Sequence, residues 1–360
     1  MTLSLAPSLE DFGWDDGWED AFEPHRAAGL TPGRITIQHR GAYVLATAQG
    51  EIWAELPRRL LRLAESEGSL PAVGDWVGWQ ANGAGGRALV EAILPRRSSF
   101  SRKTPWHEVR EQVVAANVDV VFLVQALPDD VNVRRLERYL ATAWDSGALP
   151  ELVLTKIDLV DDPAPFVAEL EQVALGVPVH LVSNVTGEGL DELRAEIKPG
   201  RTAALLGSSG IGKSTIVNSL VGEALFETQE LRRDGRGRHT TSHRELVLLP
   251  GGGVVLDTPG MRELQLWSVD DGLERTFEDI EELAAGCRFA DCAHEQEPGC
   301  AIREALATGS LDEERWQSYR KLQRELQALH VRMDALGRKE RVRRIRVQAK
   351  ARRKDPKPGR

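Results

Sequence analysis

The segment that most restricts the fold of this chain is Gly207–Ser214, because it fits the pattern Gly, any four residues, Gly-Lys-Ser/Thr. The apolar run Thr202–Leu206 precedes it, and a helical pattern over Lys213–Leu220 follows it. Glycines let the backbone curl so that successive N–H groups face phosphate oxygens, and the N-terminus of the following helix adds positive charge. The sequence therefore predicts a phosphate-binding loop between a strand and a helix. Its residues are Gly207, Ser208, Ser209, Gly210, Ile211, Gly212, Lys213 and Ser214.

Two side chains of this loop have expected roles in phosphate chemistry. The charge of Lys213 serves the β- and γ-phosphates, which makes this residue a catalytic as well as a binding candidate. The hydroxyl of Ser214 is placed for Mg²⁺. Thr215, the next residue of the helix, is a further expected contact of the nucleotide.

A second set of residues is expected to select the base. Thr155, Lys156, Ile157 and Asp158 follow the predicted strand Glu151–Leu154. The carboxylate of Asp158 can accept hydrogen bonds from guanine N1–H and from the 2-amino group, and adenine offers neither donor, so this residue favours GTP over ATP. The stem of Lys156 would lie along the base.

The next predicted strand, Val177–Val182, ends in the sequence Ser-Asn-Val-Thr-Gly at residues 183–187. This turn can close over guanine O6. Ser183 and Asn184 are therefore candidate base contacts.

Two further elements are expected around the γ-phosphate. Asp257 ends the apolar run Val254–Leu256 and can hold Mg²⁺ through its water, while the N–H of Gly260 can reach the γ-phosphate. Residues 232–242 are rich in glycine and arginine and end in His239, Thr240 and Thr241. A loop with a hydroxyl that completes the Mg²⁺ shell is what a nucleotide-sensing switch requires, with Thr241 as the first choice and Thr240 as the second.

The order of these elements is unusual, because both base-binding segments precede the phosphate loop. Apolar runs alternate with helical patterns, which predicts a parallel sheet covered by helices on both faces. All the expected ligand residues follow strands, and ligands of open α/β sheets bind at the carboxyl ends of strands. The sequence therefore predicts one site assembled in circularly permuted order. Besides the strands named above, we expect the strand Val118–Leu127, the helices Val133–Ser146, Pro165–Leu175 and Leu190–Ile197, and the hairpin His243–Leu249 with Val254–Leu256.

The N-terminal part has a different pattern, with short alternating runs broken by glycine between about Gly33 and Arg102. Five such runs predict a small OB-type barrel. Trp53, Trp76 and Trp79 could stack on bases there, although tryptophans more often fill or edge a core. Residues 1–30 are acidic and aromatic, and we expect a poorly ordered arm or a docking segment. The five runs are Arg34–Gln38, Ala42–Ala48, Glu51–Leu56, Asp75–Gln80 and Ala88–Leu94.

All three cysteines of the chain lie in one stretch with a histidine: Cys287, Cys292, His294 and Cys300. Three thiolates and one imidazole fill a tetrahedral zinc shell and leave no position for water, so the expected site is structural. The alternative is a group of free buried thiols. Around it the sequence reads as helical, with regular apolar spacing over Arg315–Leu336.

Charge is distributed unevenly along the chain. Residues 338–360 hold 12 Lys/Arg and two acidic residues, a net charge of +10. Because the whole chain has a net charge of −9, the remaining residues carry a net charge of −19. Such a tail is drawn to phosphates, although a solvated end is an equal alternative. There is neither a long apolar run nor a secretory signal at the start, so we expect a cytoplasmic protein with no membrane contact.

The element order, the His-Thr-Thr loop, the preceding barrel and the following Cys–His cluster together resemble the ribosome small-subunit-dependent GTPase A family. The resemblance implies a multi-domain chain that hydrolyses GTP in late maturation of the small ribosomal subunit, binds its ribosomal RNA and is stimulated by it. It also implies GTP or GDP with Mg²⁺, one structural Zn²⁺, and, we expect, a monomer. The expected segments are an acidic arm (1–30), an OB-fold barrel (31–104), a permuted GTPase domain (105–266), a mainly α-helical zinc domain (267–336) and a basic tail (337–360).

This chain departs from common GTPase patterns at two positions. Thr155 stands where the guanine motif usually has Asn, so we expect loss of an amide that tethers the loop. Met261 follows Gly260 where many GTPases have a water-orienting Gln, so intrinsic hydrolysis should be slow and His239 becomes a candidate for orienting the water. The alternative function is a nucleotide-regulated RNA-binding protein with little turnover.

Overall fold

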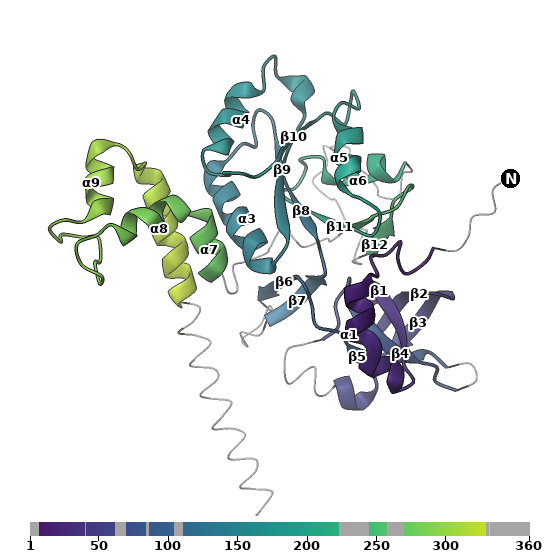
Figure 1. Cartoon of the computed structure of the whole chain (residues 1–360). Coiled ribbons are helices and arrows are strands. Elements are labelled where there is room, and N and C mark those ends of the chain that lie inside the picture. Colours follow the sequence, from purple (N-terminus) through teal and green to yellow (C-terminus); the bar gives the residue numbers. More distant parts are fainter. Residues whose placement is uncertain are drawn as a thin grey trace, which may run out of the picture.

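The structure is a computed structural model, and it describes residues 7–39, 41–61, 70–83, 86–103, 111–222, 245–257, 270–328 and 331. Figure 1 shows a small β-structure at the N-terminal end of the chain, a central sheet flanked by helices, and a group of helices formed by the C-terminal part. Among the described residues, no helix is long and apolar enough to cross a membrane.

The N-terminal β-structure is a closed five-stranded barrel, as the sequence predicted. Strand β1 pairs antiparallel with both β2 and β4, β2 pairs with β3, and β5 closes the barrel between β3 and β4. Every strand lies within three residues of the run that predicted it. The strands are β1 (Thr31–His39), β2 (Ala42–Thr47), β3 (Gly50–Glu55), β4 (Trp76–Gln80) and β5 (Ala88–Ile93).

The acidic N-terminal segment is not a loose arm where it is described. Helix α1 (Asp16–Ala27) begins at Asp15, whose side chain accepts a hydrogen bond from the N–H of Trp18. Trp18 and Phe22 are buried in the core shared with the barrel. The ring of Trp76 lies 6.1 Å from that of Trp18. The expectation of poor order was wrong here, because the aromatic residues of this segment are packing residues.

Residues 99–116 also differ from the expectation. We expected the barrel to continue to about residue 102, but β6 (Ser99–Lys103) pairs with β7 (Glu111–Ala116) in a separate two-stranded sheet. The buried Arg34 joins this region to the barrel and to the N-terminal segment. Its guanidinium donates hydrogen bonds to the carbonyl oxygens of Gly74, Phe12 and Asn117, the last over 2.9 Å.

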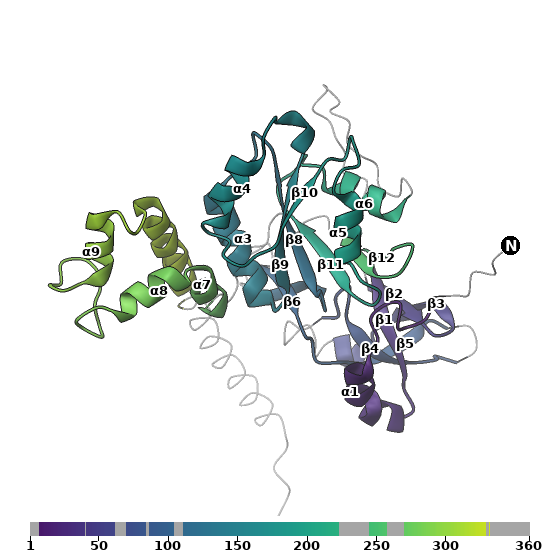
Figure 2. The same ribbon diagram turned by 45° about the horizontal axis from the view of Figure 1, so that its top comes forward.

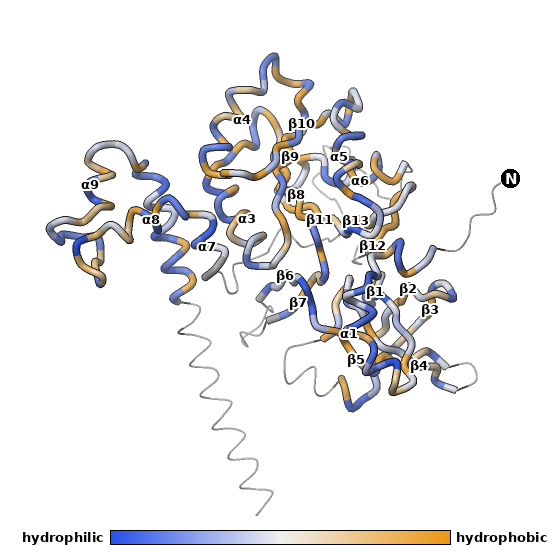
Figure 3. The backbone as a smooth tube through the Cα atoms, in the orientation of Figure 1, coloured by the Kyte–Doolittle hydropathy of each residue, from blue (hydrophilic) through white to orange (hydrophobic). Residues whose placement is uncertain are grey.

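The central sheet has the strand order β10-β9-β8-β11-β13-β12, and only β12 runs antiparallel to its neighbour. Figure 3 shows hydrophobic residues concentrated in its inner strands. The strands are β8 (Val120–Ala126), β9 (Leu149–Thr155), β10 (Val179–Val182), β11 (Thr202–Leu206), β12 (Glu245–Leu248) and β13 (Val254–Asp257).

Helices cover both faces of this sheet, as predicted. The side chains of α3 and α4 pack with one set of alternating strand residues, and those of α5 and α6 pack with the other (Figures 1 and 2). Helix α3 has the bounds expected from the sequence, because Asn132 caps its first turn and Gly147 ends it at a φ of 85°. The helices are α3 (Val133–Ser146), α4 (Ala164–Glu171), α5 (Leu190–Glu196) and α6 (Lys213–Val221).

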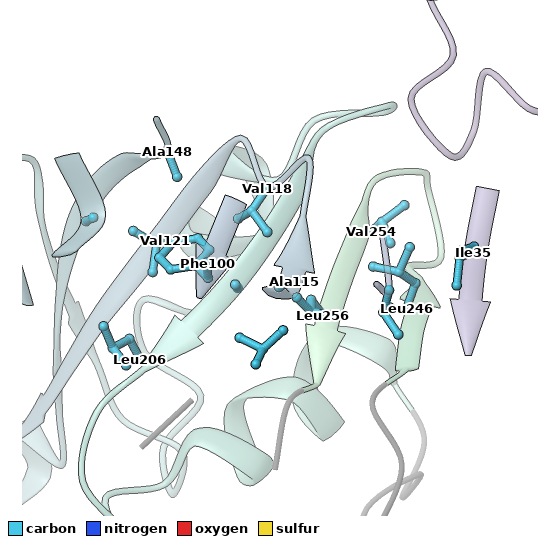
Figure 4. Close-up of a cluster of buried hydrophobic side chains, with 14 of the residues drawn as sticks. Ile35, Phe100, Ala115, Val118, Val121, Ala148, Leu206, Leu246, Val254 and Leu256 are labelled. Atoms are coloured by element: carbon cyan, nitrogen blue, oxygen red, sulfur yellow. The ribbon is translucent and has the colours of Figure 1, made fainter. Parts of the chain in front are cut away.

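The barrel and the central sheet are one continuous sheet of hydrogen-bonded strands. Strand β1 of the barrel pairs with β12, with Ile37 opposite Glu245. Figure 4 shows Ile35 of the barrel beside Leu246 and Val254 of the hairpin, within a hydrophobic cluster that extends into the central sheet. The barrel is therefore fixed to the strand that follows residues 223–244.

The C-terminal helices pack on α3, and a residue of α3 belongs to their core. Ala141 is buried with Phe277, Ile280 and Trp316. A Cβ on Gly272 would lie 2.2 Å from the carbonyl oxygen of Ala141, so only glycine allows this approach. In Figures 1 and 2 these helices lie beside α3. They are α7 (Asp270–Thr276), α8 (Glu278–Ala285), α9 (Ala301–Thr308) and a helix over residues 313–328.

Candidate nucleotide and metal sites

The base-binding and phosphate-binding segments lie at one edge of the central sheet. Strands β8, β9, β10 and β11 are parallel, so their carboxyl ends share an edge. Thr155, the last residue of β9, lies opposite Ala126 of β8 and Val182 of β10. On the other side of β8, Leu206 of β11 lies opposite Leu123, and the phosphate loop starts at the next residue. Two segments in reversed sequence order therefore meet at one rim.

The phosphate loop needs glycine at its start because other backbone lies close to it. A Cβ on Gly207 would lie 2.5 Å from the carbonyl oxygen of Val124. Gly212, at a φ of 99°, has the left-handed conformation that favours glycine, and α6 begins directly after it. The loop is therefore held tightly between β8 and its own helix.

The ammonium group of Lys213 lies over this loop. It donates hydrogen bonds to the carbonyl oxygens of Gly207, over 2.8 Å, and of Ser208. The side chain of Ser214 is exposed at the first turn of α6. A cation and a hydroxyl thus stand together at a helix N-terminus, where the helix dipole favours anions.

Ser183 supports the carboxylate that we expect to select the base. Its Oγ donates a hydrogen bond to Oδ1 of Asp158 over 2.5 Å, and accepts from the main-chain N–H groups of Val185 and Thr186 over 3.2 and 3.1 Å. Ser183 is buried, whereas Asp158 is exposed in the short 3₁₀ helix η1 (Ile157–Leu159). The turn after β10 therefore orients one carboxylate oxygen of Asp158, a residue that is otherwise exposed.

The side chain of Thr155 tethers the phosphate loop. Its hydroxyl lies 2.8 Å from the carbonyl oxygen of Ile211 and 3.3 Å from that of Gln125. The amide is absent, as expected, but the loop keeps a tether because the hydroxyl of Thr155 provides one. Sequence reasoning missed it because the carbonyl lies 56 residues away.

Tyr139 of α3 is a neighbour of the loop that the sequence did not single out. Burial raises the pKa of its hydroxyl, which also makes a hydrogen bond with Ser208. Its position fits the apolar face of the helix, so no sequence pattern separates it from an ordinary core residue.

Several expected site residues lie outside the described residues. These are His239, Thr240, Thr241, Gly260 and Met261. Asp257 ends β13, where its backbone lies opposite Glu245.

The cysteines and the histidine form a cluster with the dimensions of a zinc site. Nδ1 of His294 lies 3.5 Å from Sγ of Cys287 and 3.4 Å from Sγ of Cys300, and these two sulfurs are 3.9 Å apart. All four possible ligand atoms, including that of Cys292, lie within 4.8 Å of one another. Zinc–sulfur bonds of about 2.3 Å place the sulfurs of a tetrahedral site about 3.8 Å apart, so the residues fit the ion.

Two neighbours hold this cluster in place. The carboxylate of Glu297 accepts hydrogen bonds from the N–H groups of Ala293, Glu295 and Gln296 over 2.9–3.1 Å. Main-chain hydrogen bonds, first that of its own N–H and then these, lower its pKa to about 2. The ring of Trp316 meets that of His294 edge-on, with centroids 5.7 Å apart. The loop therefore has its own supports as well as the four possible ligands.

This fold and this site define a circularly permuted P-loop GTPase. The model of the family described as RsgA GTPase matches residues 93–267. A protein of Opitutus terrae described as small ribosomal subunit biogenesis GTPase RsgA is 48% identical over 328 residues, which cover 88% of this chain and 89% of that protein. A relative with the same description from Streptomyces coelicolor is 46% identical over 341 residues, 92% of this chain and 90% of that one. The chain belongs to the RsgA GTPase family and is a GTP hydrolase.

Two solved structures have a similar fold. YjeQ from Thermotoga maritima is 26% identical, with a TM-score of 0.60 over 82% of this chain and 98% of that one. YloQ, described as a circularly permuted GTPase, is 23% identical and has a TM-score of 0.59 over 83% and 96% of the two chains, a likeness of fold.

Proposed function

We propose that this GTPase acts in late maturation of the small ribosomal subunit, binds ribosomal RNA of that subunit and is stimulated by it. The relatives are described as small ribosomal subunit biogenesis GTPases. The observation that carries the nucleotide site is the contact of Thr155 with Ile211, which joins the base-binding segment to the phosphate loop. We place the protein in the cytoplasm, where small ribosomal subunits are assembled, and we propose that it is a monomer.

In the proposed site Asp158 accepts the N1–H and 2-amino hydrogen bonds of guanine, and Lys156 lies along the base. The turn at Ser183 and Asn184 covers O6. Gly207–Ser214 and Thr215 surround the phosphates, with the charge of Lys213 on the β- and γ-phosphates. Ser214, Thr241 and Asp257 would hold Mg²⁺, which would neutralise charge that develops on the phosphate oxygens, and the N–H of Gly260 would reach the γ-phosphate.

His239 is the proposed group that orients the attacking water, because Met261 cannot hydrogen-bond a water usefully. This assignment rests on the sequence, since both residues lie outside the described part of the chain. Hydrolysis stimulated by the subunit would then require the subunit to position His239. A variant His239→Ala that keeps normal stimulated turnover would remove this role.

Cys287, Cys292, His294 and Cys300 are proposed to hold one structural Zn²⁺. Because four protein ligands would leave no position for water, the ion would cross-link a small helical unit and would take no part in the reaction. Alongside GTP or GDP and Mg²⁺, it completes the proposed cofactors.

For RNA contact we propose the barrel surface around Trp53. A pocket of about 610 Å³ there is lined by Trp53, Trp79, Arg87 and smaller side chains. Trp53 is 49% exposed, its ring stacks on that of His39 at 5.0 Å, and the guanidinium of Arg87 lies 5.5 Å from its centroid. Aromatic rings beside a cation suit unpaired bases and phosphates. Trp76 is buried in the core and takes no part.

The test is GTP turnover with and without purified small ribosomal subunits. We expect slow turnover alone and strong stimulation by the subunits, with no turnover in Lys213→Ala. Equal rates with and without subunits would contradict the proposed partner. Stimulation by large subunits alone would also contradict it.

A further inference from the structure

The hydroxyl of Thr155 is committed to contacts inside the protein. Thr155 is fully buried, and its Oγ1 contacts two main-chain carbonyl oxygens, of Ile211 at 2.8 Å and of Gln125 at 3.3 Å. A threonine hydroxyl has one hydrogen to donate. Position 155 therefore tethers the phosphate loop and has no donor left for a bound base.

Asn184 offers a side-chain amide close to the same place. It follows Ser183, which supports Asp158, and its Nδ2 lies against the phosphate loop, 2.8 Å from where a Cβ on Gly212 would be. Its contact with the carbonyl oxygen of Gly212 is long, at 3.5 Å. Its Oδ1 is buried and has no hydrogen-bond partner among the residues that the structure describes. The amide thus lies against the phosphate loop, one residue after the support of Asp158, and has hydrogen-bonding capacity that the described contacts leave unused.

Guanine presents two kinds of edge to such a site. N1–H and the 2-amino group are donors, which suit Asp158, whereas O6 and N7 are acceptors. The main chain of residues 183–187 covers O6 in the proposed site. N7 belongs to the ring that carries the ribose, so it lies on the side of the phosphate loop, where the amide of Asn184 is. The hydroxyl of Thr155, committed to main-chain carbonyl oxygens, provides no donor there.

We propose that the side-chain N–H of Asn184 donates a hydrogen bond to N7 of guanine and so supplies, from the neighbouring strand, the amide that is missing at position 155. Thr155 then tethers the loop, and Asn184 reads the base. This inference rests on the proposed guanine site around Asp158. It makes Asn184 a specificity residue for a purine that has a nitrogen at position 7.

The experiment measures binding of GDP and of 7-deaza-GDP, in which carbon replaces N7, to the full chain. The wild type should bind 7-deaza-GDP about 5- to 10-fold more weakly than GDP, the effect of one neutral hydrogen bond. Asn184→Ala should bind GDP about 5- to 10-fold more weakly than the wild type does, with no change for 7-deaza-GDP. Leu175→Ala, at an exposed position after α4, is the matched control and should leave both affinities unchanged.

Moving the amide from position 184 to position 155 gives a second test, which looks for a gain of nucleotide preference and not for a loss of affinity. In Thr155→Asn with Asn184→Ala, an amide at position 155 should restore the preference for GDP over 7-deaza-GDP. Thermal unfolding of each variant monitors the fold. Equal weakening of both nucleotides by Asn184→Ala, or a wild type that does not distinguish them, would overturn the inference.

Inosine diphosphate separates this result from failure of the site itself. It lacks the 2-amino group but keeps N7, so it tests Asp158 and not Asn184. Wild-type protein that binds inosine diphosphate as tightly as GDP would contradict the guanine site around Asp158. If inosine diphosphate binds weakly and only the 7-deaza comparison fails, the guanine site stands and the role of Asn184 is wrong.

Discussion

The hydroxyl of Thr155 donates a hydrogen bond to the main-chain carbonyl of Ile211 over 2.8 Å, although the two residues are 56 positions apart. Thr155 ends the strand before the base-selecting segment, and Ile211 lies inside the phosphate loop. This contact joins the two halves of a site whose sequence order is reversed. Strand ends of a parallel sheet share one rim in either order, so the permuted chain builds the same site.

The first prediction concerns this contact. Thr155→Val keeps the shape of the side chain but leaves the carbonyl of Ile211 without its donor, at a cost of about 1–3 kcal/mol. Affinity for GDP, measured by calorimetry, should therefore fall by about 5-fold or more. Thr155→Ser retains the hydroxyl and should bind GDP nearly as the wild type does. Full affinity in Thr155→Val would show that the contact does not order the loop.

Much of the fold could be predicted because hydrophobic periodicity is local. Helix α3 has the expected bounds, and the strands of the barrel and of the central sheet match the apolar runs that predicted them. The phosphate loop could be predicted because its glycines are required by backbone geometry. Features that depend on partners far away in the sequence could not be predicted. The packing of α1 on the barrel and the contacts of Ser183 and Thr155 join segments whose proximity no local pattern encodes.

The second prediction concerns a buried ion pair between α3 and the C-terminal helices. The carboxylate of Glu137 is fully buried and accepts hydrogen bonds from Arg134 (2.7 Å), Arg315 (3.0 Å) and Ser318 (2.5 Å). Glu137→Ala leaves the nearly buried Arg315 without one of its partners, at a cost of about 3–5 kcal/mol. Hydrogen exchange in α8 should become markedly faster.

Its control is a pair between the same two parts of the chain that remains in contact with solvent. Glu325 binds Arg138 at 2.9 Å, with the two side chains 41% and 30% exposed. Glu325→Ala should cost less than about 1 kcal/mol. Similar effects of the two substitutions would mean that the buried pair does not hold the helices on α3.

The third prediction concerns the metal. Protein purified under reducing conditions should contain one zinc ion per chain by elemental analysis, because three thiolates and an imidazole complete a tetrahedral shell. Cys292→Ser removes one ligand and should lower zinc retention. Affinity for GDP should stay unchanged, since the cluster lies among the C-terminal helices. Protein without zinc but with an intact C-terminal fold would contradict the assignment.

The fourth prediction concerns the barrel pocket. Trp53→Ala should weaken binding of single-stranded RNA by about 1–3 kcal/mol if one base stacks there, without changing affinity for GDP. Leu149→Ala, a similarly exposed apolar side chain on β9, is the control and should have no effect. Unchanged RNA affinity in Trp53→Ala would contradict a role in RNA binding. The exposed tryptophan would then serve only its contacts with His39 and Arg87.

The central claim is that Asp158 and the phosphate loop bind the two ends of one guanine nucleotide. The most direct test compares GDP with xanthosine diphosphate, whose base has a carbonyl in place of the 2-amino group, on Asp158→Asn and on Asp161→Asn, an exposed neighbour. Removal of two hydrogen bonds to a carboxylate should weaken GDP binding by about 100-fold or more and reverse the preference toward xanthosine diphosphate. Asp161→Asn should behave as the wild type does. A variant Asp158→Asn that still prefers GDP as strongly as the wild type would contradict the account.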